Sequence, residues 1–166
     1  MATSLKGDHR SSIGVVVATH APLANALVET AKDVMGEAWD EHADAVVAVD
    51  VDAQNNAASA FECVSKAIAE ADHGFGVLVL ADLFGGSAAN IALAQLAADR
   101  VEVVTGVNLA MVLKAVRHRQ DWESPAALGD MVAEAARQSV VVAGSLLAAM
   151  PNRSDSDAAA GSGAQA

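Results

Sequence analysis

The chain has little cysteine and few aromatic residues, and each shortage excludes something. Cys63 is the only cysteine among 166 residues, so no disulfide can form within the chain, which is typical of a reducing compartment. Aromatic residues make up 3% of the sequence and tyrosine is absent, so the core must be built from Ala, Val, Leu and Ile. We expect Cys63 to be a small buried residue on a helix.

Basic residues are also scarce. The sequence has ten Lys and Arg residues and 21 Asp and Glu residues, so its net charge is −11. Because binding to the phosphate backbone of a nucleic acid needs clustered basic residues, we expect no nucleic-acid partner. The longest apolar stretch, from 140 to 150, is well short of the ~20 residues that span a bilayer. The first twelve residues contain no apolar segment of the kind that a signal peptide needs. These features predict a cytoplasmic protein without a membrane span.

The pattern of apolar residues predicts one domain over residues 13–149, with flexible tails at 1–12 and 150–166. Short runs rich in Val and Leu are apolar on both faces, as in buried parallel strands, and segments with helical spacing separate them. The predicted strands are Ile13–Ala18, Ala45–Val51, Gly76–Ala81 and Val101–Thr105. The predicted helices are Pro22–Met35, Asn55–Glu70, Ser87–Ala97, Asn108–Arg119 and a last one that begins at Ser124-Pro125.

This alternation of strands and helices predicts an α/β fold. We expect a doubly wound, mostly parallel sheet in the flavodoxin-like order 2-1-3-4, with helices on both faces. The segment "SVVVAGSLL" (Ser139–Leu147) is ambiguous, since three valines favour a strand while its later residues would suit a helix. We interpret it as a fifth strand at the edge of the sheet, covered by a second subunit.

Polar residues follow two of the predicted strands. His20 comes after the first strand, and "ADLFGGSAAN" places Asp82, Gly85, Gly86 and Ser87 after the third. In the order 2-1-3-4 these two strands are neighbours, and ligands of such sheets bind beyond the carboxyl ends of the strands. The sequence therefore predicts that His20, Asp82 and the glycine turn meet in one crevice.

These residue types suit phosphoryl transfer. A neutral histidine offers a nitrogen lone pair, and a carboxylate on its other ring nitrogen fixes the tautomer and stabilises positive charge during attack. Gly85 and Gly86 allow the backbone to approach a phosphoryl group, and the hydroxyl of Ser87 adds a donor. Thr19 either bonds to this site or completes the strand. Each feature alone is also met as a cap or a turn, and no metal or cofactor is expected.

Three segments resemble the mannose-type IIA component of the bacterial sugar phosphotransferase system. "GVVVATHAPLANAL" is similar to the first strand and phosphoacceptor histidine of that family, "LADLFGGSAANIAL" to its Asp-x-x-Gly-Gly-Ser turn, and "VEVVTGVNLAMVLKA" to its Gly-Val-Asn segment. In order and spacing they cover Ile13 to about Leu147.

The resemblance implies a phosphoryl carrier. His20 would accept the group from the histidine-containing phosphocarrier protein and pass it to a histidine of a IIB component, with association with the membrane components IIC and IID. Asp82 would orient His20, and Thr19, Gly85, Gly86 and Ser87 would line the phosphoryl site. The resemblance also implies a homodimer that exchanges an antiparallel C-terminal edge strand. Asn108 is expected to be structural, as the cap of the helix after the fourth strand.

Two positions depart from the family pattern: Ala21 and Ala88 stand where the family commonly has glycine and proline. No IIB-like segment follows in the sequence, so the acceptor is expected to be a separate chain. Several alternatives stay open: a IIA-like component that feeds dihydroxyacetone kinases, a regulatory relative in the same family, a receiver-like signalling domain phosphorylated on Asp82, and a module that binds a nucleotide without chemistry. The sequence does not distinguish transport from regulation, nor name a sugar.

Overall fold

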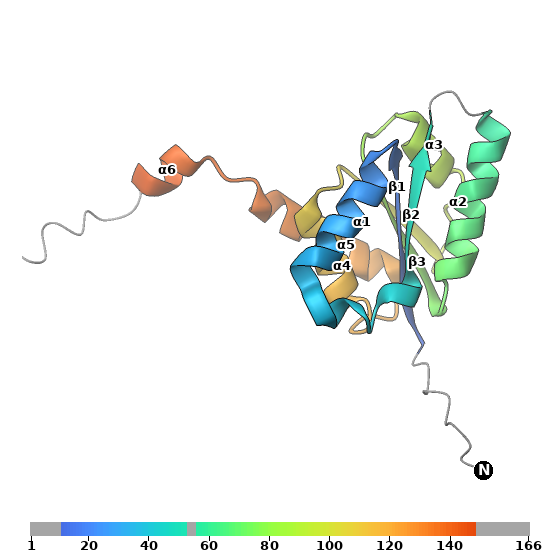
Figure 1. The fold of residues 1–166 in the computed structure, drawn as a ribbon, viewed down its shortest axis with the longest axis horizontal. Coiled ribbons are helices and arrows are strands. Elements are labelled where there is room, and N and C mark those ends of the chain that lie inside the picture. The colour runs from blue at the N-terminus through green and yellow to red at the C-terminus, as the bar shows by residue number, and fades with distance from the viewer. Residues whose placement is uncertain (1–10, 53–55, 149–166) are drawn as a thin grey trace, which may run out of the picture.

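The four predicted strands form one parallel sheet. A computed structural model of the chain describes residues 11–52 and 56–148 (Figure 1). Within them the strands lie in the order β2-β1-β3-β4. The predicted α/β fold and its strand order are confirmed. The strands are β1 (Ser12–His20), β2 (Val46–Val51), β3 (Gly74–Ala81) and β4 (Val101–Thr105). Ser12, which we assigned to the tail, is the buried first residue of β1.

Helices cover both faces of the sheet because side chains of alternate residues point to opposite faces of a strand. Val15 and Val17 of β1 pack into a core that is closed by α1 (Leu23–Met35), α4 (Leu109–His118) and α5 (Pro125–Ser139). Val16 and Ala18 face the second core, under α2 (Ala57–Ala71) and α3 (Ser87–Leu93). Two short 3-10 turns, Gly36–Trp39 and Ala43–Ala45, connect α1 to β2.

Helix starts agree with their predicted caps. The side chain of Asn108 accepts a hydrogen bond from the backbone of Met111 at 3.0 Å, and Ser124 caps α5 ahead of Pro125 in the first turn. The prediction that Asn108 is structural is therefore confirmed. Of the helix predicted for Ser87–Ala97, only Ser87–Leu93 is helical; a turn follows it, and Ala97 forms an isolated antiparallel bridge with Val101.

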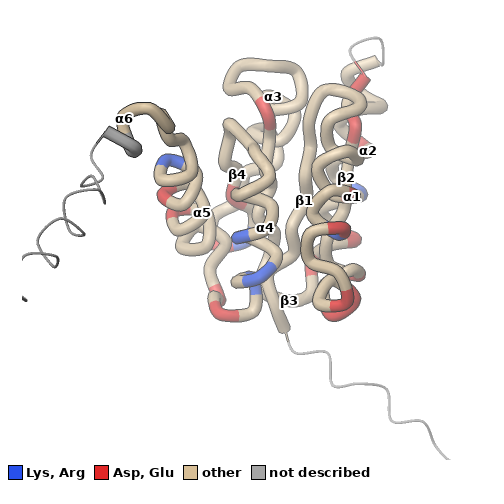
Figure 2. Tube along the Cα trace, turned by 60° about the vertical axis from the view of Figure 1, so that its left-hand side comes forward, with Lys and Arg blue, Asp and Glu red and all other residues tan. Residues whose placement is uncertain are grey.

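The prediction of a strand at Ser139–Leu147 is wrong for the single chain. Helix α5 continues to Ser139, Val140–Val142 belong to no strand, and α6 (Ala143–Ala148) is a short helix that lies away from the sheet (Figures 1 and 2). A strand needs a neighbouring strand to pair its N–H and C=O groups. This segment leaves the sheet, so no strand lies beside it within the described chain.

One further expectation is corrected, because Cys63 is exposed on α2, not buried. A polar cluster lies at the other end of the sheet, where His42 is 9% exposed and accepts a hydrogen bond from the buried guanidinium of Arg119. Arg119 also donates to the hydroxyl of Ser12 at 2.6 Å, so it ties the start of β1 to the connection between α1 and β2. This polar cluster lies beyond the end of α4, near the start of β1 and far along β1 from His20.

Candidate functional site

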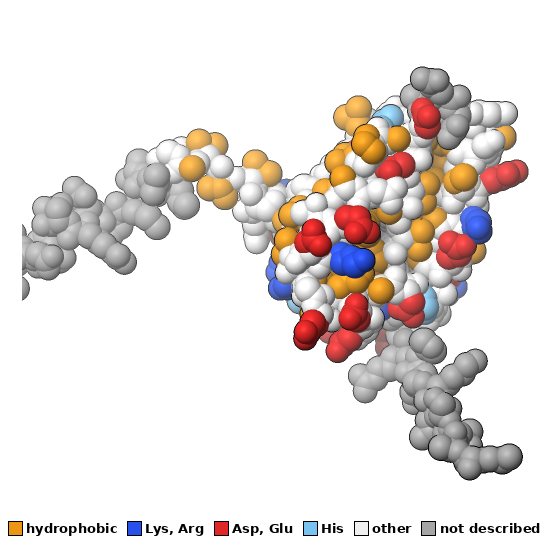
Figure 3. All heavy atoms as spheres, in the orientation of Figure 1, with side chains coloured by type: hydrophobic (Ala, Val, Ile, Leu, Met, Phe, Trp, Pro, Cys, Tyr) orange, Lys and Arg blue, Asp and Glu red, His pale blue; other side chains and the backbone are white. Residues whose placement is uncertain are grey.

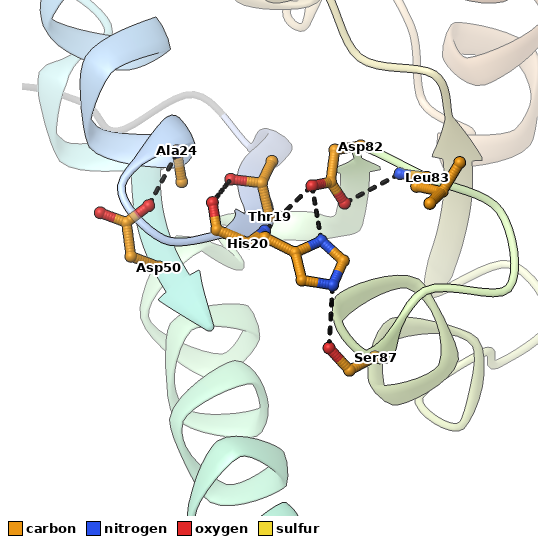
Figure 4. A network of polar contacts seen from close by, with 7 residues as sticks. All are labelled: Thr19, His20, Ala24, Asp50, Asp82, Leu83 and Ser87. Atoms are coloured by element: carbon orange, nitrogen blue, oxygen red, sulfur yellow. Dashed lines mark hydrogen bonds and ion pairs between the residues drawn. The ribbon is translucent and has the colours of Figure 1, made fainter. Parts of the chain in front are cut away.

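The predicted site residues meet where β1 and β3 end. His20 is the last residue of β1, Asp82 directly follows β3, and Ser87 is the first residue of α3 (Figure 4). Because β1 and β3 are parallel neighbours, their carboxyl ends lie side by side. The sheet order thus brings together His20 and Asp82, which are 62 residues apart in the sequence.

Three hydrogen bonds hold the Asp82 carboxylate in place. Its Oδ2 accepts from the backbone N–H of His20 at 3.0 Å and lies 2.8 Å from His20 Nδ1. Its Oδ1 accepts from the backbone N–H of Leu83 at 2.8 Å. Both oxygens are therefore fixed relative to the backbone of the two segments, so the carboxylate has one orientation toward the imidazole.

The surroundings of Asp82 favour its charged form. Burial alone would raise the pKa of this carboxyl, but the hydrogen bonds from the His20 side chain, the His20 backbone and the Leu83 backbone outweigh it and hold the pKa below the usual value. Asp82 is thus an ionised acceptor at neutral pH. In its hydrogen bond with His20, the donor is therefore the N–H group at Nδ1 of the imidazole.

This tautomer leaves the lone pair on the other ring nitrogen of His20. Nε2 lies 3.0 Å from the hydroxyl oxygen of Ser87, which donates its proton to that lone pair. The His20 side chain is 38% exposed, so Nε2 can be reached once the hydroxyl turns away. The arrangement anchors one ring nitrogen of His20 and leaves the other available for chemistry.

The two glycines shape the turn against the imidazole. Gly85 has φ +83°, in the region that favours glycine. Gly86 has an ordinary backbone, but a Cβ on it would lie 2.8 Å from His20 Cε1, closer than side-chain atoms pack. The turn is closed by a hydrogen bond from Gly86 N to Leu83 O at 2.9 Å, and the Asn90 side chain bonds to Gly85 O.

Thr19 lies beneath this surface. Its side chain is fully buried, and its hydroxyl donates to the carbonyl of His20 at 3.2 Å. In this structure Thr19 therefore supports the backbone at the end of β1 and does not face the open side of the site.

Sequence reasoning missed Asp50. This carboxylate, near the end of β2, accepts from the backbone N–H of Ala24 at 2.8 Å and from the side chain of Asn25 at 2.6 Å. It holds the start of α1, the helix that follows His20 (Figure 4). A signal was present, because Asp50 is the only charged residue in the strand Val46–Val51.

Large apolar side chains surround the site. Leu23, Leu83 and Phe84 lie in the segments that follow β1 and β3, and they are 40%, 63% and 74% exposed. Figure 3 shows hydrophobic side chains gathered at this end of the molecule. Exposed apolar residues around a polar centre are typical of a surface that contacts another protein.

A family model described as "PTS system fructose IIA component" (EIIA-man) matches residues 14–135. The chain belongs to this family. The mannose-specific EIIAB component of Escherichia coli K12 is 31% identical over 131 residues, which cover 78% of the chain and 39% of that protein. The transcriptional regulatory protein LevR of Bacillus subtilis is 30% identical over 115 residues, covering 69% of the chain and 11% of that protein. The chain thus spans well under half of these curated relatives.

Solved structures agree with the fold. A PTS IIA protein associated with the fucose utilization operon of Streptococcus pneumoniae is 25% identical, with a TM-score of 0.70 and coverage of 83% of the chain and 99% of that structure. The mannose/sorbose-specific IIA subunit of Enterococcus faecalis is 25% identical, with a TM-score of 0.66 and coverage of 78% and 93%. The predicted family is confirmed. Among the described residues, no helix is both long and apolar enough to cross a bilayer.

Proposed function

We propose that this IIA component is a histidine phosphocarrier, in which Nε2 of His20 accepts a phosphoryl group from the histidine-containing phosphocarrier protein and passes it to a histidine of a IIB component, for sugar uptake or its regulation. The observation that carries the proposal is the pairing of His20 Nδ1 with Asp82 at 2.8 Å, which assigns the nucleophilic lone pair to Nε2 of a side chain that is 38% exposed.

The transfer needs no net movement of protons. The lone pair of His20 Nε2 forms the new N–P bond while the N–P bond of the donor breaks and its electron pair returns to the donor imidazole. Positive charge develops on the His20 ring, and the ionised Asp82 stabilises it through Nδ1–H. Transfer to the acceptor reverses these roles.

The turn before α3 supplies donors for the phosphoryl oxygens. In the free protein the Ser87 hydroxyl oxygen lies 3.0 Å from His20 Nε2. During transfer this hydroxyl turns toward the incoming phosphoryl group. The first hydrogen bond of α3 runs from Asn90 N to Gly86 O, so the N–H groups of residues 87–89 have no partner within the helix. Gly85 and Gly86 keep the backbone close to the imidazole.

Protein partners fit the form of the site. Leu23, Leu83 and Phe84 offer an apolar rim to the donor and then to the acceptor, so both partners bind the same face in turn. In this proposal the chain works in the cytoplasm, and IIB links it to the membrane components IIC and IID. Sedimentation with membranes only when IIB, IIC and IID are present would support that link, and sedimentation without them would contradict it.

We also propose a homodimer that exchanges the segment after α5. Val140, Val141 and Val142 are each more than half exposed, and β4 is an edge strand whose Val103 N–H bonds to the Glu102 side chain instead of another strand. A second copy could pair its valines with this edge. Light scattering at the mass of a dimer, reduced to a monomer by Val141→Glu, is the expected result; a monomeric parent protein would contradict it.

The test of the carrier uses intact mass. The protein is incubated with phosphoenolpyruvate, enzyme I and the histidine phosphocarrier, beside His20→Ala and His118→Ala. His118 is the matched control, since its side chain is 40% exposed and its Nδ1 lies 2.9 Å from Asp121. We expect one acid-labile phosphoryl group on the parent and on His118→Ala, and none on His20→Ala. Equal phosphorylation of all three proteins would overturn the assignment to His20.

A regulatory role is the second candidate, and the match to LevR favours it. In that case His20 still carries the phosphoryl group, and its phosphorylation state changes the affinity for a regulated partner. Transfer from the phosphorylated protein to purified IIB separates the two roles. Rapid transfer supports sugar uptake, whereas stable phosphorylation in the presence of IIB supports regulation.

A further inference from the structure

The helix that follows His20 has no cap of its own. Pro22 stands at the N-cap of α1 and makes no side-chain capping bond, although the first N–H groups of a helix need partners from outside it. Asp50 of β2 provides one such partner, since its Oδ1 accepts from the backbone N–H of Ala24 at 2.8 Å; its Oδ2 accepts from the side-chain amide of Asn25 at 2.6 Å. Its negative charge also suits the positive end of the helix dipole.

This arrangement differs from that of α2, α4 and α5. Each of those helices is capped by the residue that directly precedes it, Asn56, Asn108 or Ser124. In α1 the cap comes from a different strand, 26 residues away from Ala24. The start of α1 is therefore joined to the sheet by the carboxylate of Asp50, in addition to the packing of the helix in the core.

The end of β2 holds the turn after His20 at a second point. The backbone N–H of Ala21 donates to the carbonyl of Val51 at 3.1 Å, and Thr19 and His20 pair with Asp50 and Val51 across the two strands. The segment His20–Pro22 is therefore fixed on one side by the β-ladder and on the other by the Asp50 cap. Movement of α1 would move the backbone that carries the imidazole.

We propose that Asp50 is a positioning residue for phosphoryl transfer, acting through the start of α1 on the orientation of His20. The proposal rests on the carrier function proposed above. In-line attack requires the nucleophile and phosphorus at close range along one line, and a displacement of about 1 Å can lower the rate by about 10²-fold. Asp50 touches neither the imidazole nor the phosphoryl group in this account.

The test compares two caps of similar kind. Asp50→Ala removes the cap of α1, and Asn56→Ala removes the side chain that accepts from Ala58 N at 3.0 Å at the start of α2, a helix that does not follow the histidine. Asp50→Asn keeps an oxygen for the Ala24 N–H. Rapid-quench transfer from the phosphorylated donor gives the limiting rate constant and the donor concentration for half-maximal rate, and ¹⁵N NMR reports on the His20 ring.

We expect Asp50→Ala to lower the limiting rate constant about tenfold or more, with little change in the half-saturating donor concentration, and to shift or broaden the His20 ring signals. Asp50→Asn should recover most of the rate, and Asn56→Ala should match the parent in both measurements. Parent-like transfer and ring signals in Asp50→Ala would overturn the positioning role, as would an equal loss of rate in Asn56→Ala. If the parent protein itself accepts no phosphoryl group, the carrier function fails first, and unchanged ring signals in Asp50→Ala would then overturn the positioning of His20 independently.

Discussion

Two histidine–aspartate pairs in this molecule look alike in isolation. His20 Nδ1 lies 2.8 Å from Asp82 and His118 Nδ1 lies 2.9 Å from Asp121, and the two imidazoles are 38% and 40% exposed. They differ in how the pair is made. Asp121 is three residues from His118, just after the end of α4, whereas Asp82 comes from another strand and is fixed by two backbone N–H groups. A histidine–aspartate contact alone therefore does not identify the functional site.

The second ring nitrogen separates the pairs further. Nε2 of His20 lies against the Ser87 hydroxyl, and a side chain at Gly86 would touch the imidazole ring. Within the described residues, the side chain of His118 forms a hydrogen bond to Asp121 alone. His118 ends α4 and Asp121 follows three residues later, so proximity in the sequence accounts for this pair without any chemistry.

The largest expected effect comes from replacing Asp82, the carboxylate that is paired with His20. Asp82→Asn should slow phosphoryl transfer to His20 by roughly 10² to 10³-fold. The two carboxylate oxygens of Asp82 accept from three N–H groups, and the side-chain amide of asparagine would have to direct its own NH₂ group at one of these donors. The negative charge beside the ring is lost as well. Rapid-quench transfer rates measure the effect.

Asp121→Asn is the control for that experiment and should transfer at the parent rate. If both variants lose the same factor, the two pairs are equivalent and the distinction drawn above is wrong. If neither loses rate, Asp82 does not stabilise the developing charge.

A smaller effect is expected from Gly86→Ala. The backbone of Gly86 has φ −70°, which alanine adopts freely, so any loss must come from the new methyl group against His20 Cε1 and Leu83 O. We expect a loss of about 10²-fold or less in transfer rate, through displacement of the ring. Gly144→Ala, where a Cβ meets nothing within 4 Å, should leave the rate unchanged. A parent-like rate in Gly86→Ala would show that the ring tolerates displacement.

The smallest expected effect concerns the pH dependence of stability and a third histidine, His42, which lies beside the guanidinium of Arg119. Burial, and then the charge of Arg119, lower the pKa of His42 below its ordinary value of 6.5, while Glu41 and Asp44 oppose the shift. The unfolded chain therefore binds more protons than the folded one just below pH 6.5, and stability falls as the pH falls through that range. Melting temperatures between pH 7.5 and about 5.5 should decline less in His42→Asn than in the parent. An identical decline would remove His42 from the pH response.

Much of the fold and site could be predicted from sequence because the signals are local. Two-sided apolar runs mark the parallel strands, and the residues after β1 and β3 must then meet once the sheet order is 2-1-3-4. Asp50 escaped prediction because its role is a contact between a strand end and a helix start that lie 26 residues apart. His42 escaped because its acidic neighbours in sequence gave no sign of the buried Arg119.

The segment Val140–Val142 shows a different limit. Its three valines indicate a strand, but whether they form one depends on a partner strand that a single chain does not bring alongside them. The β-propensity of a segment predicts which conformation suits it, and the assembly decides whether that conformation is reached.

The most direct test of the account is the site of the N–P bond. The protein, labelled with ¹⁵N at histidine and phosphorylated by its donor, is examined by NMR for coupling between phosphorus and ring nitrogen. We expect coupling to Nε2 of His20, with the proton retained on Nδ1 and the His118 ring unchanged. Coupling to Nδ1 of His20, or to any other histidine, would contradict the role given to Asp82.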